Sequence, residues 1–185
     1  MRLEHRLDRA FGIERAHMTA VHAYTNVQRL ADVPGDDMRM SRAAAENIVP
    51  SETNCAHVLD QVLPELRGVV RASALRVPVQ NGSIVDFTIW AKRPVTKDGI
   101  NEVMRTAADG PFRGILEYQE DPIVSSDVVN SEYSSVFDSL ATMVLEGNPF
   151  KCIAWFDNSW GYSHRVVDLV RKMARQDGLL KEDAA

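Results

Sequence analysis

The chain has 185 residues, of which 45% are hydrophobic and 25% are charged, values that suit one large globular domain, or at most two small ones, with a sizeable core. The formal net charge is -5, and 21 Lys and Arg residues are interleaved with 26 Asp and Glu residues, so no basic face is available for nucleic acid or an anionic membrane. No apolar run reaches membrane-spanning length, and the polar start does not suit a signal peptide, so we expect a cytoplasmic protein.

The first predicted elements are a helix and a strand. A short amphipathic helix over residues 3–11 ends at Gly12. A β-rich run over residues 18–25 predicts a strand whose C-terminal end presents His22 and Thr25. Residues 26–50 are polar and irregular, and a loop of this length tends to be functional or to form an interface.

The middle of the chain predicts a helix followed by two long strands. Ser51 or Thr53 can cap the helix, whose apolar face we expect to carry Val58, Val62 and Leu63. Residues 69–79 and 83–93 are β-rich and are joined by Gln80-Asn81-Gly82, a strong hairpin signal that predicts two neighbouring strands.

The remaining elements are mainly strands between two helices. Thr96 caps a helix that runs to about Asp109, and the last helix covers about residues 160–176. The strands expected between them cover residues 116–120, 123–125, 143–145 and 150–156. Since strands dominate without regular βα alternation, the predicted class is α+β, with a large mixed, mainly antiparallel sheet and helices packed on one face.

Two motifs that would indicate other chemistry do not occur in this sequence. No GxGxxG follows a strand, so no dinucleotide-binding half is predicted, and residues 1–185 are expected to form a single domain. The two cysteines, Cys55 and Cys152, have neither CxxC spacing nor a cluster of further ligands, so no disulfide framework and no metal site are expected.

The residues around His22 suggest an anion site beside a general base. An imidazole with a pKa near neutrality can accept and return a proton, although a single histidine at a strand end is more often structural. Thr25 and several arginines follow it in the chain, and hydroxyls and guanidinium groups are the groups that hold phosphate. For Arg29, Arg39 and Arg42, pairing with nearby carboxylates is the simpler interpretation.

Arg76 differs from these arginines because it lies inside an apolar strand, where a charge needs a partner or a ligand. The segment from Asp157 to Tyr162 is open to two interpretations. Its polar residues can cap the last helix, or Asn158 and Tyr162 can hold a planar ligand such as a nicotinamide.

Five segments carry a resemblance to a known family. They are Thr19-Ala-Val-His-Ala-Tyr-Thr-Asn-Val-Gln-Arg, Ser41-Arg-Ala-Ala-Ala-Glu-Asn-Ile-Val-Pro, Ala74-Leu-Arg-Val-Pro-Val-Gln-Asn, Phe137-Asp-Ser-Leu and Trp155-Phe-Asp-Asn-Ser-Trp-Gly-Tyr-Ser. In order and spacing they resemble the catalytic domain of phosphorylating glyceraldehyde-3-phosphate dehydrogenases, and the related erythrose-4-phosphate dehydrogenases share most of them. The resemblance extends from about Phe11 to Ala174.

The resemblance implies a role for each matching residue. His22 matches the histidine that activates the catalytic thiol and assists hydride transfer. Thr25 and Arg76 match groups that hold the phosphate of the sugar substrate, and Thr53 matches the site of the attacking inorganic phosphate. Asn158 and Tyr162 match residues at the nicotinamide of NAD or NADP. The loop over residues 24–47 matches a loop that helps to build the family's tetramer, so a homo-oligomer is expected.

The sequence also departs from the family pattern at four positions near these sites. Val27 replaces an acidic residue, Met40 replaces an arginine, Asn54 replaces a glycine and Ser159 replaces a glutamate. Loss of a charge-assisted contact at Met40 should weaken anion binding by about 1.5–3 kcal/mol.

The family's nucleophilic cysteine would align before Met1, and Cys55 matches an alanine of the family. We therefore expect this chain alone to be inactive and to bind no cofactor tightly, unless a separate polypeptide supplies the NAD-binding half and its cysteine. Two alternatives remain open, which are a non-catalytic anion-binding or assembly module and a truncated relic. A sugar phosphate or inorganic phosphate is the expected small-molecule partner.

Overall fold

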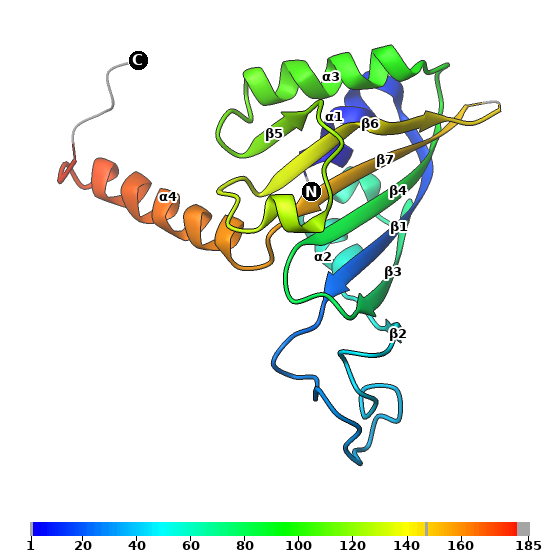
Figure 1. Cartoon of the computed structure of the whole chain (residues 1–185). Coiled ribbons are helices and arrows are strands. Elements are labelled where there is room, and N and C mark those ends of the chain that lie inside the picture. The colour runs from blue at the N-terminus through cyan, green and yellow to red at the C-terminus, as the bar shows by residue number, and fades with distance from the viewer. Residues whose placement is uncertain (1, 147, 181–185) are drawn as a thin grey trace.

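The computed structural model describes residues 2–146 and 148–180, and its centre is a seven-stranded sheet in the order β2-β3-β1-β4-β7-β6-β5 (Figure 1). The strands are β1 (Ile13–Ala23), β2 (Val49–Ser51), β3 (Val70–Val77), β4 (Ser83–Ala91), β5 (Leu116–Gln119), β6 (Ser135–Val144) and β7 (Pro149–Phe156). Four of the six strand pairings are antiparallel, and the pairings β1–β3 and β5–β6 are parallel. The predicted mixed, mainly antiparallel sheet is confirmed.

Three helices cover one face of this sheet, as predicted. They are α1 (Arg2–Phe11), α2 (Cys55–Val62) and α3 (Lys97–Asp109). Leu7, Leu59 and Met104 from these helices join one core cluster with Met18 and Phe87 of the sheet. Because strand side chains alternate between the two faces, the apolar positions of β1 and β4 meet the helices while their neighbours face the other side.

Helix α3 follows its sequence signals closely. The side-chain oxygen of Thr96 accepts a hydrogen bond from the Gly99 N–H at 3.1 Å, which satisfies a free donor of the first turn. Ile100, Met104 and Ala107 are buried, and their spacing of three to four residues produces the predicted inward stripe.

Helix α2 departs from the prediction in its cap and in its buried face. The N-cap residue is Asn54, whose side chain makes no capping hydrogen bond. Leu59 is the buried residue, whereas Val58 and Val62 are 45% and 50% exposed. Leu63, which follows the helix, is buried as predicted. The other two predicted positions, Val58 and Val62, are one residue before the buried pair Leu59 and Leu63, because adjacent apolar residues in so short a helix leave the buried face ambiguous.

The predicted hairpin between β3 and β4 is wrong, because β1 lies between these two strands. Ala20 of β1 pairs with Ala74 of β3 on one side and with Val85 of β4 on the other. The connection between β3 and β4 therefore crosses two strand spacings, or about 10 Å, which a two-residue turn cannot span. Gly82 still adopts the left-handed conformation with φ of 81°, so the turn signal was correct although the pairing was not.

Two of the shorter predicted strands also differ. Residues 123–125 form no strand, and a short 3-10 helix covers Ser125–Val128, with the Asp127 side chain accepting the Val124 N–H at 2.7 Å. The strand predicted at residues 143–145 is the end of the longer β6, whose pairing with β7 shifts register between Asp138 and Met143. This irregularity interrupts the alternation of apolar and polar residues from which a strand is predicted.

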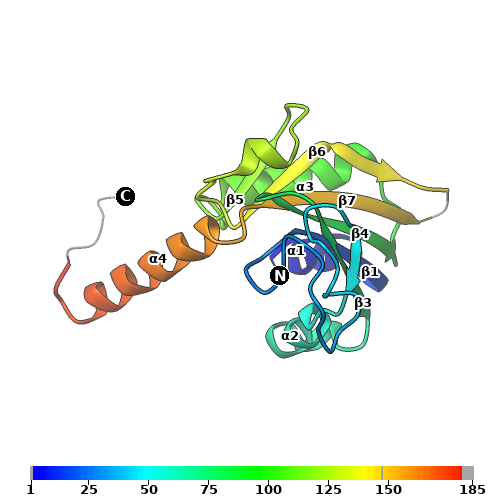
Figure 2. The ribbon, with the colours of Figure 1, turned by 60° about the horizontal axis from the view of Figure 1, so that its bottom comes forward.

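The last helix, α4 (Trp160–Gln176), has the predicted bounds but points away from the sheet (Figure 2). Its apolar side chains are exposed, including Val166, Leu169, Val170 and Met173. Among the residues that the structure describes, none of the helices has the length and apolar character needed to span a lipid bilayer.

Candidate anion-binding and catalytic site

The ends of four strands meet at one end of the sheet. His22, near the end of β1, is the register partner of Arg76 in the parallel strand β3. On the other side of β1, the Ala23 N–H donates to the hydroxyl of Ser83 at the start of β4, and Ser83 pairs with Phe156 at the end of β7. Residues far apart in sequence therefore lie together here.

The structure brings three of the predicted site residues into one group. An Arg76 guanidinium N–H donates to the Thr25 hydroxyl over a long distance of 3.4 Å. The His22 ring packs edge-on against Phe156, with ring centroids 6.0 Å apart. The parallel pairing of β1 and β3 is what places a guanidinium and a hydroxyl beside the imidazole.

The surroundings of His22 favour its neutral form. Burial lowers the pKa of His22 below its ordinary value of 6.5, and the nearby Arg76 charge lowers it further. At neutral pH the ring therefore has a free nitrogen lone pair that can accept a proton.

A pocket of about 510 Å³ opens beside Arg76. It is lined by Asp37, Arg39, Met40, Pro50, Ser51, Glu52 and Arg76. The Arg76 Nε and the Ser51 hydroxyl are buried without a hydrogen-bond partner, and no carboxylate in the described residues forms an ion pair with Arg76. A half-buried charged group with a buried, unpaired Nε–H favours an anion in this pocket.

The other arginines of this region have different surroundings. Arg42 forms an ion pair with Asp32 at 3.2 Å, so the simpler interpretation from sequence holds for this residue. Arg39 lines the pocket together with Met40, which occupies the position where the resemblance implies a second arginine. Sequence reasoning did not find that Asp37 and Glu52 also line the pocket, because no local pattern connects them to Arg76.

Thr53 is placed near the pocket but not among its lining residues. It follows β2, whose Val49 pairs with Arg76. The Thr53 hydroxyl accepts the Cys55 N–H at 3.2 Å, so this group supports the first turn of α2. The structure therefore does not bring Thr53 into the group formed by His22, Thr25 and Arg76.

The two predicted cofactor residues lie on the turn between β7 and α4. Asn158 is exposed and Tyr162 is 73% exposed, and neither side chain has a hydrogen-bond partner within the described residues. An amide and a phenol ring without internal partners are available to a planar ligand.

Asp157 organises this turn and is 3% exposed. Its carboxylate accepts hydrogen bonds from the N–H groups of Ser159, Trp160 and Asn130 at 2.8, 2.8 and 2.9 Å, and from the Asn81 amide at 2.6 Å. Burial alone would raise the pKa of Asp157, but these four hydrogen bonds lower it to about 2. The sequence predicted capping at this turn but not the contacts with the distant Asn81 and Asn130.

Neither cysteine belongs to the group around His22. Cys152 is buried in the core, where burial and the Asp86 charge raise the pKa of its thiol far above the ordinary value. Cys55 is exposed at the start of α2.

Taken together, an unneutralised guanidinium, a hydroxyl and a neutral imidazole at one end of a sheet define a class of protein. It is an α+β domain that can hold an anion next to a proton acceptor.

Comparisons with known proteins identify the family. A model described as glyceraldehyde 3-phosphate dehydrogenase, C-terminal domain, matches residues 1–158, so the chain belongs to this family. This match confirms the fold implied by the sequence resemblance. The glyceraldehyde-3-phosphate dehydrogenase of Borreliella burgdorferi is 51% identical over 171 residues, covering 91% of this chain and 51% of that protein. The enzymes of the same name from Streptomyces coelicolor and Geobacillus stearothermophilus are 51% and 47% identical, covering 88% and 91% of this chain. The chain spans about half the length of these relatives.

Proposed function

We propose that this chain is the substrate-binding half of a glyceraldehyde-3-phosphate dehydrogenase, which oxidises a sugar-phosphate aldehyde. The observation that carries the proposal is the half-buried guanidinium of Arg76, which has no carboxylate partner, is hydrogen-bonded to Thr25 and lies on the residue that pairs in register with His22. Arg76 and Thr25 hold the phosphate of the substrate, and this fixes the rest of the molecule near the imidazole.

His22 acts as the proton acceptor in this proposal. Because burial and Arg76 keep the imidazole neutral, it is ready to take a proton from a thiol or hydroxyl at pH 7. A phosphate bound at Arg76 would partly cancel the guanidinium charge and thereby raise the basicity of the ring. Anion binding and proton transfer are coupled through this pair.

In this proposal neither Cys55 nor Cys152 supplies the catalytic thiol. Cys152 is too deeply buried and too weakly acidic, and Cys55 does not belong to the His22 group. We therefore expect the chain alone to show no NAD-dependent oxidation of glyceraldehyde 3-phosphate. Turnover that is lost in Cys55→Ser would contradict this expectation.

Asn158 and Tyr162 would hold the nicotinamide of NAD or NADP, since both side chains are exposed and free of internal partners. The cofactor, when bound, supplies the hydride acceptor. The exposed apolar side chains of α4, together with the half-length match to the relatives, support a cofactor-binding half that docks against this helix. Without that half, we expect no tight cofactor binding.

Self-association is the expected assembly. The loop after β1 exposes Val27, Leu30, Met38 and Ile48, with between 63% and 84% of each residue accessible. A loop with this many exposed apolar side chains is suited to contact a second copy. A monomer in sedimentation velocity at micromolar concentration would contradict this expectation.

A second candidate function is a binding module that holds phosphate without catalysis. It is favoured by the equal number of carboxylates (Asp37 and Glu52) and guanidinium groups (Arg39 and Arg76) in the lining of the pocket, although neither carboxylate forms an ion pair with Arg76. Met40 also removes a cation that the family pattern implies. Weak binding of one phosphate with no cofactor-dependent chemistry, even after the other half is supplied, would favour this candidate.

The test of the anion site is phosphate titration by calorimetry. We expect wild-type chain to bind inorganic phosphate and Arg76→Ala to bind it roughly 10-fold or more weakly, since a hydrogen bond to a charged group contributes about 1.5–3 kcal/mol. Arg71→Ala is the matched control, because Arg71 is an exposed arginine on the same strand. Equal phosphate affinity in the wild type and Arg76→Ala would overturn the proposal.

A further inference from the structure

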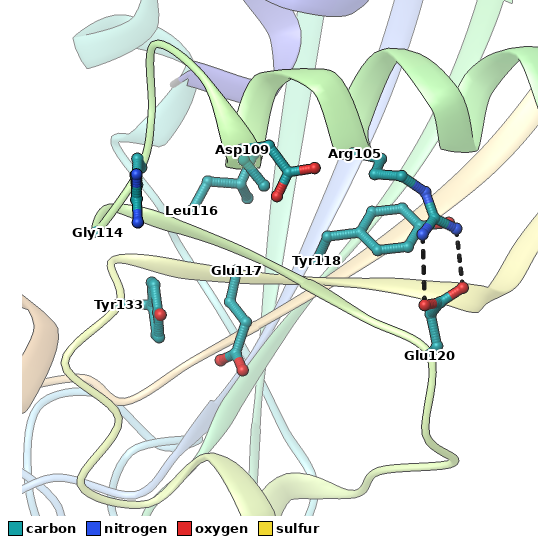
Figure 3. A pocket seen from close by; sticks show the side chains of 10 residues that line it. Arg105, Asp109, Gly114, Leu116, Glu117, Tyr118, Glu120 and Tyr133 are labelled. Carbon is teal, nitrogen blue, oxygen red and sulfur yellow. Dashed lines mark hydrogen bonds and ion pairs between the residues drawn. The ribbon is translucent and has the colours of Figure 1, made fainter.

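The far edge of the sheet has a pocket that is separate from the His22 site. It has a volume of about 590 Å³ and lies beside β5, which is separated from β1 by β4, β7 and β6. Its lining comes from the end of α3, the loop before β5, β5 itself and Tyr133 (Figure 3). We call it the β5-edge pocket, lined by Arg105, Ala108, Asp109, Arg113, Gly114, Leu116, Glu117, Tyr118, Glu120 and Tyr133.

One side of the β5-edge pocket is already neutralised. Arg105 reaches from α3 across the Tyr118 ring, with its guanidinium carbon 4.5 Å from the ring centroid. It donates to both carboxylate oxygens of Glu120, at 2.8 and 3.4 Å, as the dashed lines in Figure 3 show. This ion pair fixes the wall of the pocket and leaves no free charge there.

The other lining carboxylates have no such partner. Within the described residues, neither Glu117 nor Asp109 forms an ion pair or a side-chain hydrogen bond. Burial raises the pKa of Glu117, so its charged form is poorly solvated. Arg113 is the remaining lining cation. Two unpaired carboxylates against one guanidinium leave an excess negative charge that a cationic group can complement.

The backbone of β5 adds a second, independent feature. The Ile115 carbonyl accepts the N–H of Ser134, just before β6, so the backbone groups of Ile115 point toward β6. The N–H of the next residue, Leu116, donates to the Phe112 carbonyl and not to β6. Since backbone groups of successive strand residues point alternately to the two sides, the N–H and carbonyl of Tyr118 point away from β6. With β5 at the end of the strand order, this edge can pair with a further strand.

We propose that the β5-edge pocket binds an extended peptide segment of another protein that carries lysine or arginine. The segment lies along β5, where its backbone pairs with Tyr118, and its cationic side chain contacts the carboxylates of Glu117 and Asp109. A small organic cation would meet the carboxylates but leave the Tyr118 backbone groups unused. Backbone pairing gives the affinity and the carboxylates select the charge. This inference does not depend on the proposed function.

The probe is a labelled, end-capped pentapeptide, Thr-Lys-Val-Lys-Thr, titrated with the 185-residue chain by fluorescence anisotropy at low salt. Two companion probes separate the contributions to binding. One has glutamate in place of both lysines, and the other keeps the lysines but has N-methyl groups on alternate backbone amides. The protein variants are Glu117→Gln and, as a matched control, Glu14→Gln, which replaces an exposed glutamate outside the pocket.

We expect the lysine probe to bind the wild type and Glu14→Gln equally, and to bind Glu117→Gln about fivefold more weakly, the upper range for a single ion pair near the surface. Affinity for the wild type should fall on acidification as Glu117 takes up a proton, and the Glu117→Gln profile should be flatter. The glutamate and N-methyl probes should not bind measurably. Equal binding of the N-methyl probe, an unchanged affinity in Glu117→Gln, or no binding of the lysine probe at millimolar chain would each overturn the proposal.

Discussion

Replacing Asp157 with Asn tests whether one buried carboxylate holds the turn that presents Asn158. The substitution keeps the shape of the side chain but removes its charge, and it puts an N–H₂ group where five donors now converge. The hydrogen bonds that lose their acceptor are partly buried, so the substitution should lower the free energy of unfolding.

The magnitude follows from the pKa of Asp157. A change from 3.8 to about 2 corresponds to roughly 2 kcal/mol at neutral pH, since one pKa unit is about 1.4 kcal/mol. The turn lies close to the surface, and solvent screening reduces the expected loss to about 1–2 kcal/mol. For a chain of this length the melting temperature should fall by about 2–8 °C.

The sign of the pH dependence is fixed by the direction of this shift. A carboxyl group whose pKa is lower in the folded state stabilises the fold above its unfolded pKa of 3.8, and this stability is lost as the pH falls toward 2. The difference between the wild type and Asp157→Asn should therefore be constant from pH 5 to 7 and shrink below pH 4.

The assay is guanidinium unfolding followed by circular dichroism at a series of pH values. Asp121→Asn is the control, because Asp121 is exposed and its carboxylate makes no hydrogen bond in the described residues; it should change stability by less than about 0.5 kcal/mol. If Asp157→Asn were as stable as the wild type at pH 7, or if its deficit did not change on acidification, the reasoning would be refuted.

Three further substitutions test other parts of the fold. Gly82→Ala should lower the free energy of unfolding by about 1–3 kcal/mol more than Gly68→Ala in chemical unfolding. Both glycines have positive φ, but a Cβ at Gly82 would lie 2.1 Å from the Ser125 carbonyl oxygen, whereas a Cβ at Gly68 would meet no atom within 4 Å. Equal losses in the two variants would show that the contact with Ser125 relaxes freely. Thr96→Ala should lose about 1 kcal/mol, and Thr96→Ser should recover most of it. Glu117→Gln should raise the melting temperature at pH 7, because a carboxyl group whose pKa is raised by folding destabilises the folded state when it is ionised. The gain should vanish below about pH 4.5, where the carboxyl group is protonated in the folded and the unfolded state. An equal gain at pH 4 would contradict this prediction.

The sequence predicted those elements whose signals are local. The Thr96 cap and the apolar stripe of α3 lie within one short window, and the structure confirms both. The hairpin after β3 failed because turn residues specify a local conformation but not which strand lies alongside. A pairing of β1 with β3 depends on residues more than 50 positions apart, and no short window contains that information.

The candidate site divides in the same way. His22, Thr25 and Arg76 were identified from their residue types and from the family resemblance, and the structure places them together. Thr53 was identified by the same reasoning, yet its hydroxyl is used by the first turn of α2. The β5-edge pocket was not predicted, because its residues come from separate elements and follow no recurring spacing.

The position of β1 between β3 and β4 also constrains how the chain folds. β1 is synthesised before both of its neighbours, which come after the long loop that follows it. One side of β1 therefore stays unpaired until β3 has been made as far as Val77 and the other until β4 has been made as far as Ala91, and the loop must close before β1 can pair with either strand. We expect the sheet to assemble in a slow, non-local step, during which β1 is the segment most exposed to aggregation and most in need of a chaperone.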